Sequence, residues 1–170
     1  MKLRAIPVLL LIACFGEHIS AHEFLYNFLE VKIGDDEGVT VHFTVHAAEF
    51  SDDSTVDPTS TDTTWFETLP FSAKTRLCGR ADSEINKSYR IQSGESRLQP
   101  LPIPVEAGLD NDTRPGCLST YLSVPDSAKS ITLFYSGVGK RLLLVITRKG
   151  SFPKTHDLAS GDSCKIPLHP

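Results

Sequence analysis

The sequence predicts an all-β protein, an antiparallel β-sandwich of the immunoglobulin-like type. Apolar and polar residues alternate without interruption from Val39 to His46, which is the pattern of a strand with one buried face. The C-terminal third contains several short, strand-like segments separated by Pro and Gly turns. Short strands with turn signals between them are typical of two packed sheets.

The first two strands are expected at residues 24–33 and 39–46, joined by the turn-forming segment 34–38. In the second strand, Val41, Phe43 and Val45 should face the core, because alternate side chains point to the same face. The remaining strands are expected at residues 118–124, 130–135, 141–148 and 164–168, with shorter ones at 75–78 and 87–91. We also expect Leu133, Leu144 and Ile146 in the core.

The segment 51–64 is rich in Ser, Thr and Asp and has no apolar periodicity, so it is predicted to be a mobile loop. The order Thr64-Trp65-Phe66-Glu67 matches a capping box, which predicts one short helix near residues 64–69 that ends before Pro70. Residues 100–104 contain three prolines and are expected to form an extended edge or connector.

The N-terminus has the order of a secretory signal peptide. Lys2 and Arg4 precede an apolar run of about 11 residues, which is shorter than the roughly 20 needed to cross a bilayer. Cleavage after Ala21 would leave a single domain of residues 22–170 with no transmembrane segment. A bacterial lipobox ending at Cys14 is the alternative, and it would leave a lipid anchor on that cysteine. The protein is therefore expected to be periplasmic or secreted, or alternatively lipid-anchored.

The charge of the chain is mildly acidic, with a formal net charge of −4 and no basic stripe. This balance argues against nucleic acid as a partner. Asn86 and Asn111 each begin a glycosylation sequon, a short pattern that also arises by chance.

Three cysteines follow the signal segment: Cys78, Cys117 and Cys164. In an oxidising compartment two of them are expected to pair, and we favour Cys78 with Cys117, although spacing alone does not fix the connectivity. Cys164 would then be the unpaired thiol.

Histidines are the candidate metal ligands. His42 and His46 lie on the same face of one strand, but four residues of strand separate them by about 13 Å, too far to share one ion. They are expected to face solvent. Cleavage after Ala21 would make His22 the first residue, and its amine and imidazole would suit copper. His42, His46 or His156 would supply a further imidazole.

The search for catalytic motifs finds no phosphate-binding loop, no nucleophile elbow and no His-Glu-x-x-His zinc motif. We therefore expect a protein that is not an enzyme and needs no cofactor. The leading hypothesis is an exported β-sandwich with a binding or structural role toward an unknown protein partner. The alternatives are a copper-binding or copper-delivery domain that uses His22, and a hydrolase or glycan-acting enzyme.

Two stretches resemble a known family. They resemble the exported N-terminal domain of the bacterial hydrogenase/urease accessory membrane proteins. The first stretch comprises residues 21–24, 28–31 and 38–45, and the second comprises residues 143–150 and 158–163. In that family a membrane module with histidine-rich motifs follows the domain, and this sequence contains neither. The resemblance implies an extracytoplasmic sandwich near metal transport, and it assigns no catalytic or transport residue.

Overall fold

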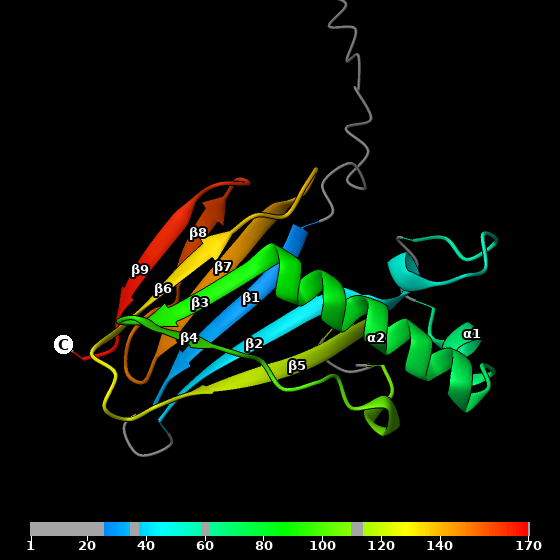
Figure 1. The fold of residues 1–170 in the computed structure, drawn as a ribbon, viewed down its shortest axis with the longest axis horizontal. Coiled ribbons are helices and arrows are strands. Elements are labelled where there is room, and N and C mark those ends of the chain that lie inside the picture. The colour runs from blue at the N-terminus through cyan, green and yellow to red at the C-terminus, as the bar shows by residue number, and fades with distance from the viewer. Residues whose placement is uncertain (1–25, 35–37, 59–61, 110–113, 170) are drawn as a thin grey trace, which may run out of the picture.

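Two β-sheets face each other across one hydrophobic core (Figure 1). The computed structural model of the chain describes residues 26–34, 38–58, 62–109 and 114–169. The larger sheet has the strand order β5 (Cys117–Val124), β2 (Val39–His46), β1 (Tyr26–Ile33), β7 (Arg141–Arg148) and β8 (Lys154–Leu158). The smaller sheet has the order β4 (Ser96–Leu98), β3 (Tyr89–Ser93), β6 (Ser130–Tyr135) and β9 (Ser163–Pro167). The predicted two-sheet architecture is confirmed.

The hairpin of β1 and β2 confirms the face assignment made from alternation. Val41, Phe43 and Val45 are buried, and Leu29 of β1 lies opposite Phe43. The other predicted core residues, Leu133, Leu144 and Ile146, are buried as well.

The larger sheet is mixed, because one of its strand pairs is parallel, whereas the other strand pairs in the described ranges are antiparallel, as the sequence predicted. β1 pairs with β2 in antiparallel fashion but with β7 in parallel, with Leu29 opposite Leu144. β1 is therefore the central strand. Its alternate residues Leu29 and Val31 are fully buried between the two layers.

Helices contribute more than the sequence predicted. The expected short helix is present as α1 (Thr64–Glu67), but Asp62, rather than a capping box at Thr64, accepts bonds from the Thr64 amide and hydroxyl at its start. The 18-residue α2 (Phe71–Ser88) follows it, so the expected limit of one short helix is wrong, as is the strand predicted at 75–78.

The helix α2 buries one apolar face. Leu77, Cys78, Ala81 and Ile85 recur at helical spacing and join the core cluster. The chain passes directly from α2 into β3, so helix and strand lie end to end over the larger sheet (Figure 1). Two single-turn 3-10 helices, η1 (Ala47–Phe50) and η2 (Val105–Ala107), flank α2.

Other connections differ in part from expectation. The strand predicted at 87–91 is β3, displaced by two residues because α2 ends at Ser88. β8 and the three-residue β4 were not predicted. Residues 51–58 and 62–63 form no helix or strand, Thr64 begins α1, and residues 59–61 lie outside the described ranges. Residues 100–104 form an extended connector, in which the Leu101 amide donates to the Tyr121 carbonyl.

The cysteines do not form the predicted disulfide between Cys78 and Cys117. The thiol of Cys78 points from α2 into the core, where burial raises its pKa and the nearby Asp82 adds to the effect. Cys117 begins β5, and its sulfur lies 3.8 Å from Nδ1 of His46 on the neighbouring strand. Cys78 and Cys164 are free thiols.

Candidate functional site

The candidate metal-binding histidines are not brought together. His42 lies opposite Glu30 of β1, on the outer face of the larger sheet. His156 lies opposite the inward-facing Leu144, so it belongs to the other face, and β1 and β7 separate its strand from β2. His22 lies outside the described residues. Within the described ranges, no group of three or more His, Cys, Asp and Glu side chains could hold a metal ion.

His42 and His46 are half-buried rather than solvent-facing, which corrects the expectation. Desolvation lowers the pKa of His42, the positive charge of Lys32 lowers it further, and Glu30 partly offsets both. The ring of His42 lies 6.3 Å from that of Tyr121, measured between centroids. Arg114 covers the same sheet face, with its guanidinium carbon 3.1 Å from the Phe28 ring centroid.

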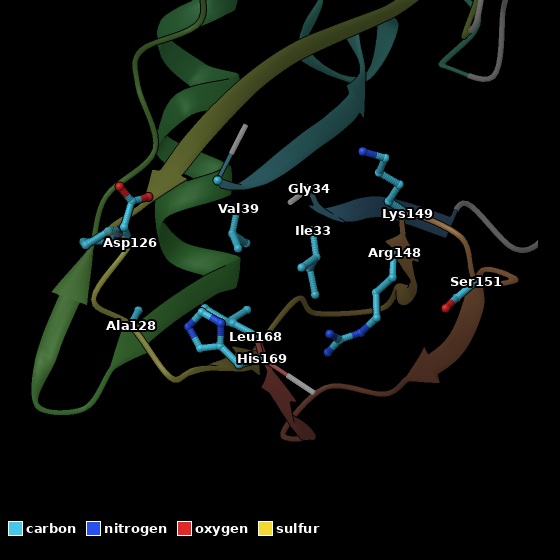
Figure 2. A pocket seen from close by; sticks show the side chains of 12 residues that line it. Ile33, Gly34, Val39, Asp126, Ala128, Arg148, Lys149, Ser151, Leu168 and His169 are labelled. Carbon is cyan, nitrogen blue, oxygen red and sulfur yellow. The ribbon is translucent and has the colours of Figure 1, made fainter. Parts of the chain in front are cut away.

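A hollow with a volume of about 540 Å³ lies at one end of the sandwich, among the ends of strands from both sheets, and is called the end hollow below. Its walls come from the connections that link the strands (Figure 2). The lining residues are Ile33, Gly34, Gly38, Val39, Pro125, Asp126, Ala128, Arg148, Lys149, Ser151, Leu168 and His169.

Local turns hold these walls in place. The Gly34 amide donates to the Gly38 carbonyl, and Gly38 has a φ of +73°, a conformation that glycine adopts without strain. Ala128 donates to Pro125, which closes the turn after β5. The Leu168 amide donates to Lys129, so the end of β9 is fixed against the β5–β6 connection.

The hollow combines apolar walls with an excess of cationic groups. Ile33, Val39 and Leu168 provide the apolar surface. Figure 2 shows the side chains of Arg148 and His169 directed toward the same space, with Asp126 at the opposite side. The Arg148 guanidinium also donates to the Pro167 carbonyl, and this bond orients it. Such a lining suits a ligand with an anionic group and an apolar portion.

A second hollow of about 390 Å³ adjoins the first and shares Ile33, Gly34, Gly38 and Lys149 with it. It extends onto the outer sheet face, where Lys32, Thr40, His42 and Thr147 line it. The one histidine that the sequence had singled out near this end, His42, therefore borders a hollow without forming a metal site.

Sequence reasoning missed the end hollow because its residues come from four separate segments of the chain, namely the β1–β2, β5–β6 and β7–β8 connections and the residues after β9. The turn signals at 34–38, 125–126 and 149–150 were all visible. Only the three-dimensional arrangement shows that these turns share one end of the molecule: β1 pairs with β7 in one sheet, and the end of β9 in the other sheet lines the same hollow.

Comparison of the chain with protein-family models, curated proteins and solved structures found no match. The resemblance to the accessory membrane proteins thus stays a prediction. In the part of the chain that the structure describes, none of the helices is both long enough and apolar enough to cross a membrane.

Proposed function

We propose that this protein is an exported, non-enzymatic β-sandwich domain that binds an anionic ligand at the end hollow. The observation that carries the proposal is the lining itself, in which Arg148 and His169 approach the same space beside Ile33 and Val39. Binding sites of this type are concave and largely apolar, and a few charged groups set their specificity. Loops grouped at one end of a β-sandwich are a common place for recognition. The immunoglobulin-like topology expected from strand spacing remains a prediction that the two-sheet architecture supports.

A titration followed by NMR tests the binding. We expect n-hexyl phosphate to shift the amide signals of Val39, Arg148 and Leu168 in a saturable way, and n-hexanol to shift them far less, because it lacks the charge. His169→Gln should weaken binding, and Arg148→Gln should weaken it more, because the guanidinium offers two donors to a phosphate.

The matched control is Arg76→Gln on the exposed side of α2, which should leave the affinity unchanged. Shifts that are absent, or that spread evenly over the molecule, would contradict the proposal. Since Arg148 also bonds the Pro167 carbonyl, thermal unfolding of each variant establishes that the fold is retained.

Export is tested by the mass of the protein recovered outside the cytoplasm. Cleavage after Ala21 gives a chain that begins at His22, and the lipobox route gives a lipidated chain that begins at Cys14. An uncleaved protein that stays in the cytoplasm would refute this part of the proposal.

A further inference from the structure

The β7–β8 hairpin presents an exposed aromatic ring at its tip. Phe152 is 95% exposed, the highest value among the exposed large hydrophobic side chains in the described ranges. Single exposed apolar residues are common on protein surfaces and carry little meaning alone. Phe152 differs from such isolated residues because basic side chains surround it.

The tip is cationic although the whole chain is acidic. Residues 148–156 include Arg148, Lys149 and Lys154 and contain no Asp or Glu, whereas the formal net charge of the chain is −4. Lys149 and Lys154 are exposed on either side of Phe152. An aromatic ring between basic residues fits an anionic lipid surface, where the ring enters the interface and the amines remain among the phosphates.

This tip is continuous with the end hollow. Ser151, next to Phe152, lines the hollow together with Arg148 and Lys149. The same end therefore offers an apolar ring for the acyl region and cationic groups for the phosphates.

The opposite end of the sandwich provides a contrast within the same chain. The β6–β7 hairpin also exposes an apolar residue, Val138, at 89%. Lys140, two residues after Val138, forms an ion pair with the half-buried Glu49. That tip therefore has an exposed apolar side chain without the surrounding positive charge.

We propose that the protein docks on an anionic phospholipid surface through the β7–β8 hairpin, with Phe152 in the interface and Arg148, Lys149 and Lys154 at the lipid phosphates. The inference rests on the proposed function, because it names the partner of the same end of the molecule. Unlike ligand binding in the hollow, docking on the lipid surface should depend on Phe152.

Co-sedimentation of the mature chain with vesicles tests the inference. We expect binding to mixed phosphatidylcholine and phosphatidylglycerol vesicles, little binding to pure phosphatidylcholine, and weaker binding at high salt. Phe152→Ser should reduce the affinity roughly tenfold, since the ring loses its burial in the interface. Lys154→Gln should reduce it about fivefold, the contribution of one basic residue near an anionic surface.

Two further variants sharpen the test. Val138→Ser, the matched control at the opposite tip, should leave vesicle binding unchanged. Phe152→Trp should retain binding and show a blue shift of its fluorescence with anionic vesicles, and Trp65 is the only other tryptophan in the chain.

The outcomes separate the two proposals. Saturable binding of n-hexyl phosphate without any vesicle binding would overturn the docking and leave the proposed function intact. Vesicle binding that Phe152→Ser and Val138→Ser affect equally would also overturn the docking. Loss of both n-hexyl phosphate and vesicle binding would refute both proposals.

Discussion

Phe43 occupies the position in the core that alternation along its strand assigns to it. It is 1% exposed, and its ring meets that of Tyr89 edge-on at 5.4 Å between centroids. The neighbouring residues on β2, His42 and Thr44, point to the other face. Strand alternation therefore predicts which face of the sheet each side chain occupies, because the period of two is a property of the backbone.

Replacement of Phe43 by Ala should reduce the free energy of unfolding by about 3–5 kcal/mol, because it removes a buried ring and leaves a cavity between the sheets. The measurement is a urea titration of both proteins. Phe134→Ala is the matched control: that ring is half-buried on β6 and lies beneath the guanidinium of Arg90, so its loss should cost less. Equal shifts in the two variants would contradict the assignment of Phe43 to the core.

The degree of burial on the outer face could not be predicted in this way. His42 is half-buried because neighbouring side chains cover it, and this lowers its pKa. Since the unfolded chain then binds the proton more readily than the folded chain, the free energy of unfolding should fall as the pH drops below the ordinary histidine value of about 6.5.

His42→Gln tests this pH dependence. The variant should lose part of the decrease in stability between about pH 7.5 and about pH 5, and urea titrations at both values measure it. His156→Gln, which removes an exposed histidine from β8, should retain the full decrease. A wild-type protein whose stability rises on acidification would show that the shift has the opposite sign.

At the scale of elements, strands were easier to predict than the main helix. β2, β6 and β7 have the residue ranges that were predicted from their β-branched and alternating residues. α2 was missed because its buried face consists largely of small residues, with Cys78, Ala81 and Ser88 beside only Leu77 and Ile85. The i, i+4, i+8 spacing of Leu77, Ala81 and Ile85 was the available signal.

Gly79 lies within α2, and a methyl group added there would meet no atom within 4 Å. Gly79→Ala should therefore raise the free energy of unfolding by about 0.5–1 kcal/mol, because alanine loses less backbone entropy in a helix than glycine. Gly94→Ala is the matched control, with equally open space but a φ of +59°, so it should destabilise the protein. Thermal unfolding of both variants measures the difference. A destabilising Gly79→Ala would contradict the helix.

At the scale of the whole molecule, the order of the strands decides what lies together. The parallel pairing of β1 with β7 joins segments more than a hundred residues apart, as the Asn27–Tyr135 hydrogen bond also does. No local pattern encodes such a pairing, so the end hollow could not be predicted although each of its turns could. The same topology places His42 and His156 on opposite faces, which one-dimensional spacing did not reveal.

Copper binding is the alternative function that concerns the processed molecule as a whole. In this alternative, cleavage after Ala21 would allow the amine and imidazole of His22 to chelate Cu(II) together, which requires a free N-terminus. None of the described histidines adds a second imidazole from a preformed cluster. We therefore expect only weak Cu(II) binding in calorimetry, the same in the processed chain and in one with a single extra residue before His22. Submicromolar binding that the extra residue abolishes would favour copper handling over the proposed anion-binding function. In that case His46→Gln would test whether the imidazole of His46, which lies beside Cys117, is the second copper ligand. This variant should then bind Cu(II) more weakly, whereas His156→Gln should bind it as the unmodified chain does.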